Sequence, residues 1–352
     1  MTRSIAYSPA LDGLRALAVI SVMLFHLDAF ALGWAGVPLF FVLSGYLITS
    51  IQLTHLEQPF GSYLTDFYWR RTMRIFPLYY AYLGVNAVVA LAKGIQLVGY
   101  GWFAAYLANY LIGVDHGQPG DGWVDHLWSL AVEEQFYLIW PAVVFFLAGS
   151  LRGIAIVLIL AAPLVRELTW QLSGNPYLAI VTLPACMDML FAGALVAVAR
   201  RNRKLLWGMA TAGAVVIIYC LEVVPYANFA STPLWVPRGQ LIFTGFALLF
   251  GPLMVACEHL GPVTRLLEIR PLVFTGRISY GLYMWHPLAF TVGRRLSERA
   301  GMAGVPTMAV CIGLAYAVAA LSWFGYERYL LRWKNAPKTW PGRAARDLAV
   351  AP

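Results

Sequence analysis

The sequence predicts an all-α fold, a polytopic transmembrane helical bundle of about ten spans with the N- and C-termini in the cytoplasm. The first observation is composition: of 352 residues, 60% are hydrophobic and only 12% are charged, whereas soluble domains are about one quarter charged. The second is the recurrence of apolar runs of about 20 residues, the length that crosses a bilayer. The third is the position of the cations behind the net charge of +8. They lie in links between the runs, which indicates membrane orientation rather than nucleic-acid binding.

The first half of the chain holds five of these runs. The run 12–31 is long enough to span and has charged residues at its start, so we interpret it as a span and not as a cleavable signal peptide. The run 37–54 follows closely, and the run 76–92 comes after an arginine-containing segment. The runs 127–148 and 153–170 are separated by a short Gly-Ser-Leu-Arg link.

A long link, residues 94–126, separates the third run from the fourth. Within it the apolar stretch 101–114 has only about 14 residues, which is too short for an ordinary span, so we expect a re-entrant or interfacial element there. The second half of the chain holds the remaining runs, which are 179–199, 205–223, 239–257, 278–296 and 305–330.

The positive-inside rule selects this topology, because a further span at 101–114 would turn the cations of 200–204 outward. With the N-terminus inside, the cytoplasmic side collects Arg70, Arg71, Arg74, Arg152, Arg200, Arg201, Arg203, Lys204, Arg265, Arg270, Arg277 and the cations of the C-terminal tail. The exceptions, left on the outer side, are Arg238, Arg294, Arg295 and Arg299.

These runs form one membrane-embedded domain, residues 1–335, followed by a cytoplasmic tail, residues 336–352. We expect no soluble domain after the last run. The cysteines lie in or at the ends of apolar runs, without metal-ligand or disulfide spacing, and we interpret them as small core residues. They are Cys186, Cys220, Cys257 and Cys311. The sequence predicts no metal site and no permanently bound cofactor.

The first span carries three ionisable residues, Asp12, Arg15 and His26, in an otherwise apolar segment. At about 100° per residue they share one face of a helix, with Arg15 and His26 about three turns apart. Polar groups inside a bilayer are costly and often mark a pathway or a reaction site. The alternative is a structural ion pair with a histidine at the helix end.

Two further motifs suit a ligand that carries phosphate groups. Arg71 and Arg74 lie one turn apart on one helical face, beside Arg70, and guanidinium groups bind phosphate in a bidentate manner. In the second span, Ser44 and Gly45 could contact a ligand that passes between the first two helices. The alternatives are membrane anchoring by the arginines and close helix packing at Ser44 and Gly45.

The fourth span carries two adjacent carboxylates, Glu133 and Glu134, shortly after Trp128 and Ser129. The carboxylates point about 100° apart, so only one of them can face a given partner. In the predicted topology they lie at a depth similar to that of His26. A histidine–carboxylate couple is the ordinary requirement for general-base catalysis on a hydroxyl group, and it would equally suit a proton relay in a transporter.

Two more spans carry polar residues. In the ninth, Ser279, Tyr283 and His286 follow the spacing i, i+4, i+7 and form a stripe that either faces a ligand or holds helices together. In the sixth, Asp188 has no basic neighbour along the chain, so it needs a partner on another helix or a proton of its own.

Five motifs therefore occur in order between about residues 8 and 330. They are Asp12-Gly-Leu-Arg15…His26, Phe40-Phe-Val-Leu-Ser44-Gly45-Tyr, Arg71-x-x-Arg74-Ile-x-Pro77, Trp128-Ser-Leu-x-x-Glu133-Glu134-Gln-Phe-Tyr and Ser279-Tyr-Gly-Leu-Tyr-x-Trp-His286-Pro. Each motif alone is weakly specific, but together they resemble the acyltransferase-3 family of bacterial integral-membrane O-acyltransferases.

The resemblance implies a ten-helix core that takes an acyl group, commonly acetyl, from cytosolic acyl-CoA and passes it to a hydroxyl, often at the outer face of the bacterial cytoplasmic (inner) membrane. It also implies essential roles for Arg15, His26, Arg71 and Arg74. Many relatives place an arginine two residues before the acid that matches Asp188, whereas this chain has Cys186 there.

We therefore expect an acyl-CoA-dependent O-acyltransferase that modifies a carbohydrate, a lipid-linked glycan or a small hydroxylated acceptor of the cell envelope and has no nucleic-acid partner. His26 would activate the acceptor hydroxyl or carry the acyl group, with Glu134, or else Glu133, as its partner. The residues expected to bind the donor are Arg70, Arg71, Arg74, Ser44 and Gly45. Asp12 and Arg15 would position the first helix or the acyl carbonyl. The residues expected to serve or support the acceptor side are Trp128, Ser129, Tyr283 and His286. The rival reading is a proton-coupled transporter or a polysaccharide-lipid exporter, which would not need the arginine pair and these motifs together.

Overall fold

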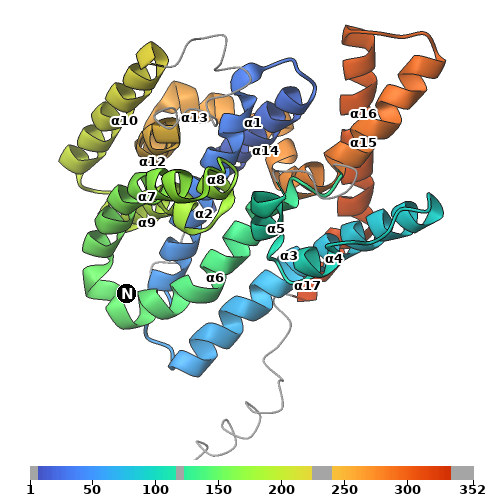
Figure 1. Cartoon of the computed structure of the whole chain (residues 1–352). Helices are drawn as coiled ribbons and strands as arrows, with labels where there is room; N and C mark the ends of the chain where they lie inside the picture. The colour runs from blue at the N-terminus through green and yellow to red at the C-terminus, as the bar shows by residue number, and fades with distance from the viewer. Residues whose placement is uncertain (1–6, 116–122, 224–239, 334–352) are drawn as a thin grey trace, which may run out of the picture.

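The computed structural model describes residues 7–115, 123–223 and 240–333, and every regular element within these ranges is helical, which confirms the all-α prediction (Figure 1). The proposed tail, residues 336–352, and Arg238 lie outside the described residues. The longer helices are α1 (Pro9–His26), α2 (Gly36–Leu53), α3 (Phe60–Ala92), α6 (Leu127–Leu147), α7 (Leu151–Ser173), α9 (Met187–Ala199), α10 (Arg203–Val223), α12 (Leu241–His259), α15 (Ser279–Arg299) and α16 (Val305–Ser322). The shorter ones are α4 (Tyr100–Ala104), α5 (Ala108–Val114), α8 (Leu178–Val181), α13 (Gly261–Leu267), α14 (Arg270–Arg277) and α17 (Arg328–Trp333).

In the described ranges, seven helical stretches are long and apolar enough to cross a membrane, so the multi-span architecture is present but the count of ten is not confirmed. They are Pro9–His26, Ala31–Leu53, Phe60–Ala92, Leu127–Ser173, Arg203–Glu222, Leu241–His259 and Val305–Leu331. The difference has three sources. The predicted runs 127–148 and 153–170 form two helices, α6 and α7, which a 3₁₀ turn at Ala148–Ser150 joins into one stretch of 47 residues, long enough for two spans. The run 179–199 is broken, and the run 278–296 lies in α15, which is too polar along its length. The orientation of the termini stays a prediction.

The third helix begins 16 residues earlier than predicted, at Phe60 rather than at residue 76. Arg70, Arg71 and Arg74 therefore lie inside a continuous helix of 33 residues, and Pro77 also lies in its interior. Tyrosine hydroxyls fix this early part of α3 on α6, because Tyr68 donates to the carbonyl of Leu138 at 2.8 Å. The arginines are thus held by a packed helix and do not belong to a loop.

The apolar stretch 101–114 forms two short helices, α4 and α5, and no single helix there could span a bilayer. The break between them falls at Tyr106, whose φ of 54° is left-handed, and its ring stacks on Tyr79 of α3 with 4.2 Å between ring centres. The stretch thus packs against α3 and α6, with Phe103, Ala108 and Ile112 buried. Its expected re-entrant or interfacial placement stays a prediction.

Breaks in the helix occur within two of the predicted runs, of which 305–330 still lies within the spanning stretch Val305–Leu331. The run 179–199 is divided into α8, a 3₁₀ turn at Pro184–Cys186 and α9, because Pro184 cannot continue the hydrogen-bond ladder of α8. The run 305–330 is divided into α16, a π-helical turn at Trp323–Glu327 and α17. A single π turn shifts the helical phase and often marks a functional position.

Close packing of α2 against α9 fixes the centre of the bundle (Figure 1). Gly45 of α2 faces the backbone of Leu190, and Gly193 of α9 faces the backbone of Val42, so a methyl group at either glycine would collide with the opposite main chain. This contact is the small-residue packing that lets membrane helices approach closely. It turns the other face of α2, which carries Ser44, toward α3, α6 and α15.

Candidate active site

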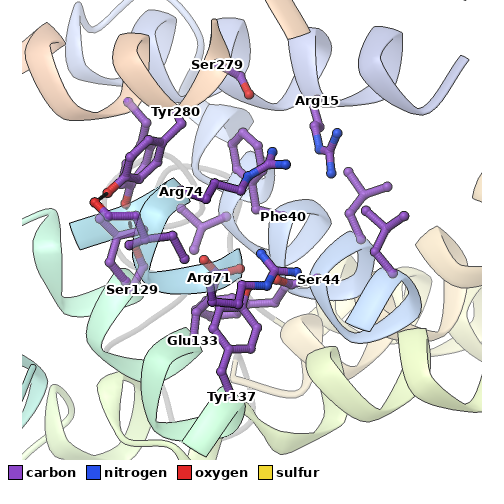
Figure 2. A pocket seen from close by; sticks show the side chains of 17 residues that line it. Arg15, Phe40, Ser44, Arg71, Arg74, Ser129, Glu133, Tyr137, Ser279 and Tyr280 are labelled. Carbon is purple, nitrogen blue, oxygen red and sulfur yellow. Dashed lines mark hydrogen bonds between the residues drawn. The ribbon is translucent and has the colours of Figure 1, made fainter. Parts of the chain in front are cut away.

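A narrow cavity, here called the arginine cavity, lies where α1, α2, α3, α6 and α15 meet, and its volume is about 110 Å³ (Figure 2). The first three of these helices follow one another along the chain, but α6 and α15 are distant from them, so the tertiary fold brings the polar residues of all five together. Of the residues predicted from the sequence, the cavity is lined by Arg15, Ser44, Arg71, Arg74, Ser129, Glu133, Ser279 and Tyr283.

The arginine cavity is rich in positive charge. Figure 2 shows Arg15, Arg71 and Arg74 directed toward the same space, with Glu133 on the wall below Arg71. The guanidinium of Arg71 lies over the ring of Tyr137, 4.7 Å from its centre, and the Tyr137 hydroxyl is hydrogen bonded to Ser44. Within the described ranges neither Arg71 nor Arg74 forms an ion pair, so the charge of both is available to an anionic ligand.

Arg15 is held in place by a short chain of contacts. It forms an ion pair with Asp12 at 2.9 Å, and Asp12 accepts a hydrogen bond of 2.6 Å from Tyr7. Tyr7, which precedes α1, in turn accepts a hydrogen bond of 3.1 Å from Arg277. Burial and the bond to Asp12 raise the pKa of Tyr7 above its usual value, so its hydroxyl keeps its proton and stays a donor. Asp12 thus fixes Arg15, and the role of the two residues in positioning the helix or the acyl carbonyl stays a prediction.

Two larger cavities adjoin the arginine cavity, and Arg74 lines all three. One of about 370 Å³ lies between α2 and α3 and is lined by Arg70 and Arg71 as well. The other, of about 430 Å³, is lined by Arg15 and Arg277. A bulky ligand with several phosphates therefore has room beside the narrow arginine cavity, with cations on its walls.

A separate cavity of about 540 Å³, here called the histidine cavity, lies at the other end of α1. His26 lines it and is exposed into it, together with His126, Asp125 and Arg294. Arg15 and His26 are 11 residues apart, which corresponds to about 16 Å along a helix axis. Aromatic side chains form a large part of the remaining walls of the histidine cavity, among them Phe25, Trp34, Phe41, Trp123, Trp128, Tyr177 and Phe290.

The arginine and histidine cavities share part of their walls. Val37, Phe41 and Tyr283 line both of them, so the two spaces adjoin at these three residues. The Tyr283 hydroxyl is bonded to Ser129 at 2.6 Å and to the carbonyl of His126 at 2.9 Å. This partition is where a group passing from the arginines to His26 would have to cross. The predicted acceptor-side residues are thereby divided: Trp128 lines the histidine cavity, Ser129 the arginine cavity and Tyr283 both.

The structure corrects the expected pairing of His26 with Glu134 or Glu133. His26 contacts His286, with 2.7 Å between its Nδ1 and the Nε2 of His286. Glu133 instead lines the arginine cavity, and one carboxylate oxygen of Glu134 is buried without a hydrogen-bond partner. The physical reason is the rotation of each helix about its own axis. This rotation directs the carboxylates of α6 toward α2 and α3, and it places His286 of α15 beside the end of α1.

Gly45 is also corrected. It was predicted to help bind the donor, but it faces the backbone of Leu190 of α9 and does not line the arginine cavity. The packing alternative is therefore the right one for Gly45, whereas Ser44 lines the cavity. The i and i+1 positions of a helix point about 100° apart, so both could not face the same ligand.

Sequence reasoning missed Arg166, the partner of Asp188. Its guanidinium forms a bidentate ion pair with the carboxylate, at 2.5 and 3.1 Å, and both side chains are completely buried. Thr244 of α12 completes the group by donating to Asp188 at 2.6 Å. The expectation of a partner on another helix is thus confirmed. The signal was available, because an arginine within the apolar run 153–170 needs an acid to offset its burial.

Two other residues gain importance only from the structure. His126, just before α6, is buried with its ring 5.4 Å from that of His286, and burial together with nearby His26 lowers its pKa to about 3. Glu327 is placed by the π-helical turn on the cavity of about 430 Å³ that Arg74 also lines. Among the described residues, no three histidine, cysteine or acidic side chains are arranged to hold a metal ion. The cysteines are buried and free, in agreement with their interpretation as core residues.

Comparison with known proteins finds a match to the family described as acyltransferase domain over residues 8–326. The chain is 30% identical over 321 residues to the peptidoglycan O-acetyltransferase OatA of Listeria monocytogenes, which covers 80% of this chain and 49% of that protein. It is 28% identical to the putative peptidoglycan O-acetyltransferase YrhL of Bacillus subtilis, covering 80% of this chain and 48% of that protein. It is also 28% identical to the O-acetyltransferase OatA of Staphylococcus aureus, covering 80% of this chain and 50% of that protein. The chain thus spans about half the length of these curated relatives. No solved structure matches it.

Proposed function

Because this chain belongs to the acyltransferase domain family, we propose that it is a membrane O-acyltransferase that moves an acyl group, most simply acetyl, from cytosolic acyl-CoA to a hydroxyl of a carbohydrate at the outer face. One observation carries the proposal. The arginine cavity and the histidine cavity share a wall, so residues suited to an anionic donor lie next to a histidine suited to activate a hydroxyl.

The donor end of the proposal rests on Arg71 and Arg74. Their guanidinium groups would bind the phosphates of CoA, with Arg70 at the edge, in the larger cavities of about 370 and 430 Å³. The arginine cavity, of about 110 Å³, is the smallest of the three and would take the extended pantetheine arm. The thioester would pass Ser44 and reach the partition formed by Val37, Phe41 and Tyr283.

Replacement of Arg71 by alanine tests the donor site. Loss of one charge-assisted phosphate contact is expected to raise the KM for acetyl-CoA about 10- to 100-fold, while kcat changes much less. Arg71→Lys should recover only part of this, because an ammonium group cannot form the bidentate contact. Arg152→Ala, at an exposed arginine of α7, serves as the matched control. If Arg71→Ala and Arg152→Ala have the same KM, Arg71 does not bind the donor.

The transfer step balances with the residues present. His26 takes the proton from the acceptor hydroxyl, the hydroxyl oxygen attacks the thioester carbon, and the carbon–sulfur bond breaks to release CoA as a thiolate that then takes up a proton. Arg15, fixed by Asp12, would face the acyl carbonyl from the donor side. In the second version of this step, His26 itself carries the acyl group. If an acyl-histidine is trapped after incubation with labelled acyl-CoA and no acceptor, His26 acts as an acyl carrier and not as a general base.

The acceptor end rests on the histidine cavity. Aromatic faces of residues such as Trp34 and Trp128 suit the apolar faces of sugar rings, and the volume of about 540 Å³ has room for a saccharide unit. Curated relatives are named peptidoglycan O-acetyltransferases. We therefore propose a cell-wall glycan, peptidoglycan first, as the acceptor class.

The transporter reading is not favoured. It shares the need for buried acids and histidines, but the family match and the O-acetyltransferase relatives both support an enzyme. The two readings differ in one product, because an acyltransferase releases free CoA and a transporter does not.

The test is therefore CoA release by the purified protein in liposomes that are supplied with labelled acetyl-CoA and with peptidoglycan fragments. We expect CoA release that depends on the acceptor, and label that becomes ester-linked to the glycan. Acceptor-independent release together with no labelled glycan would point to a different acceptor. Absence of both release and acetyl-CoA binding would contradict the proposed function.

A further inference from the structure

The contact between His26 and His286 is an in-plane hydrogen bond. The two rings are nearly coplanar, at 9° to each other, with 2.7 Å between the Nδ1 of His26 and the Nε2 of His286. The ring centres are 4.9 Å apart. This distance is about the sum of the N–N distance and the distances from each ring centre to its own nitrogen, as expected when the two nitrogens lie on the line between the centres. Two rings stacked face to face would not give this relation, so the nitrogens point directly at each other.

The proton positions in this bond follow from the other nitrogen of His286. Its Nδ1 lies 2.8 Å from the carbonyl oxygen of Tyr283 and 3.2 Å from that of Leu282. A carbonyl oxygen only accepts hydrogen bonds, so the Nδ1 of His286 carries a hydrogen. His286 has no exposed surface, and no ion pair with a carboxylate involves it within the described ranges. A charged imidazolium there would be costly, so His286 is neutral and its Nε2 is a bare acceptor.

The chain sequence itself provides the carbonyl that fixes His286. In a regular helix the oxygen of Tyr283 would accept from the main-chain nitrogen four residues later, which belongs to Pro287. Proline has no N–H, so this carbonyl is left free inside α15. The Nδ1–H of His286 donates a hydrogen bond to this carbonyl. The adjacent pair His286-Pro287 therefore acts as one unit, in which the proline leaves an acceptor that sets the tautomer of the histidine.

We propose that His286 is a positioning residue that holds His26 in its Nδ1–H tautomer and so leaves the Nε2 of His26 as the reactive nitrogen of the histidine cavity. Since the Nε2 of His286 can only accept, the Nδ1 of His26 must donate. His26 then has one free lone pair, on Nε2, and its ring is exposed into the cavity of about 540 Å³. This inference rests on the proposed function for its consequence in catalysis, but not for the tautomer.

The same bond supports either version of the transfer. When the Nε2 of His26 takes a proton or an acyl group, the ring becomes cationic and its Nδ1–H becomes a stronger donor. The Nε2 of His286 remains its acceptor, so the bond persists and strengthens. Arg294 further fixes the end of α1 by donating to the carbonyl of His26 at 2.8 Å. His286 thus has the role that a carboxylate usually has beside a catalytic histidine, without placing a negative charge in the cavity.

Two variants of His286 separate positioning from simple packing. In His286→Gln the amide oxygen lies near the former Nε2 and can still accept from His26. In His286→Asn the shorter amide reaches only the former Nδ1 position and leaves His26 without its acceptor. With acetyl-CoA and a glycan acceptor, we expect His286→Gln to retain kcat within about tenfold, and His286→Asn to lose about 100-fold. The KM for acetyl-CoA should stay unchanged in both. Equal kcat values for wild type and His286→Asn would overturn the proposal.

The tautomer is measured directly by NMR of the full-length protein labelled with ¹⁵N-histidine, with the His26 signals assigned by their absence in His26→Ala. The expected wild-type spectrum shows His26 neutral, with a protonated Nδ1 and a bare Nε2. A protonated Nε2 would overturn the proposal, whatever the activity and even if the His286 variants fail to fold. If the Nδ1–H tautomer is found but no acyl transfer occurs, the positioning inference holds and the proposed function fails.

Discussion

Replacement of His26 by alanine is expected to lower kcat for acetyl transfer about 100- to 10,000-fold, the usual contribution of a general base or nucleophile. The reason is that His26 has the imidazole exposed into the histidine cavity, whereas His286 is fully buried behind it. Binding of acetyl-CoA should be unchanged, because the arginine cavity does not include His26. The measurements are CoA release in the steady state and acetyl-CoA affinity by equilibrium binding.

The matched control for this variant is His259→Ala. His259 lies at the end of α12, beside Arg200, and lines neither the arginine cavity nor the histidine cavity. Its replacement is expected to leave kcat within about twofold. If His26→Ala retains full kcat, His26 is a structural residue and the assignment of the acceptor end is wrong. If it loses acetyl-CoA binding together with activity, the two ends of the site are coupled more tightly than the separate cavities suggest.

The second large effect is expected on stability, at the ion pair between Arg166 and Asp188. Replacement of Arg166 by methionine leaves the carboxylate of Asp188 buried without its cation, with only Thr244 beside it. Breaking a buried pair in this way costs about 3–5 kcal/mol of unfolding free energy. Unfolding of the detergent-solubilised protein by heat or denaturant, followed by circular dichroism, measures this loss.

Two further variants make this result specific. The double variant Arg166→Met with Asp188→Leu removes both charges and should recover much of the lost stability, because no uncompensated charge remains buried. Arg152→Met changes an exposed arginine on the same helix and should cost no more than about 0.5 kcal/mol. A single Arg166→Met variant as stable as Arg152→Met would show that the pair does not hold α7, α9 and α12 together.

The sequence was sufficient for the all-helical fold class and for the family. Apolar runs of spanning length predict helices wherever they occur, because in lipid the backbone must satisfy its own hydrogen bonds. Polar residues inside those runs are costly, so Arg15, His26, Glu133 and Asp188 stand out as functional or structural sites without any structure. The limits of helices were less predictable: α3 begins well before its apolar part, since tyrosines such as Tyr68 anchor a polar helical turn on α6.

The pairing of residues could not be predicted in the same way. Along one helix the angle between residues is fixed, which is why Arg71 and Arg74 were correctly placed on one face. Between helices the rotational phase depends on close packing, here on the contact of Gly45 with Leu190 that turns Ser44 to the arginine cavity. A different rotation of α6 or α15 would have given His26 a carboxylate instead of His286.

By itself, then, the sequence determined which chemical groups lie within the membrane domain and in which order along the chain. The tertiary structure alone decided that Arg166 pairs with Asp188 and that His26 bonds to His286. It also decided that the arginine and histidine cavities share the wall containing Tyr283. The physical reason is that the periodicity of a helix is local, whereas contacts between helices depend on how side chains of distant segments fit together, which no spacing along the chain records.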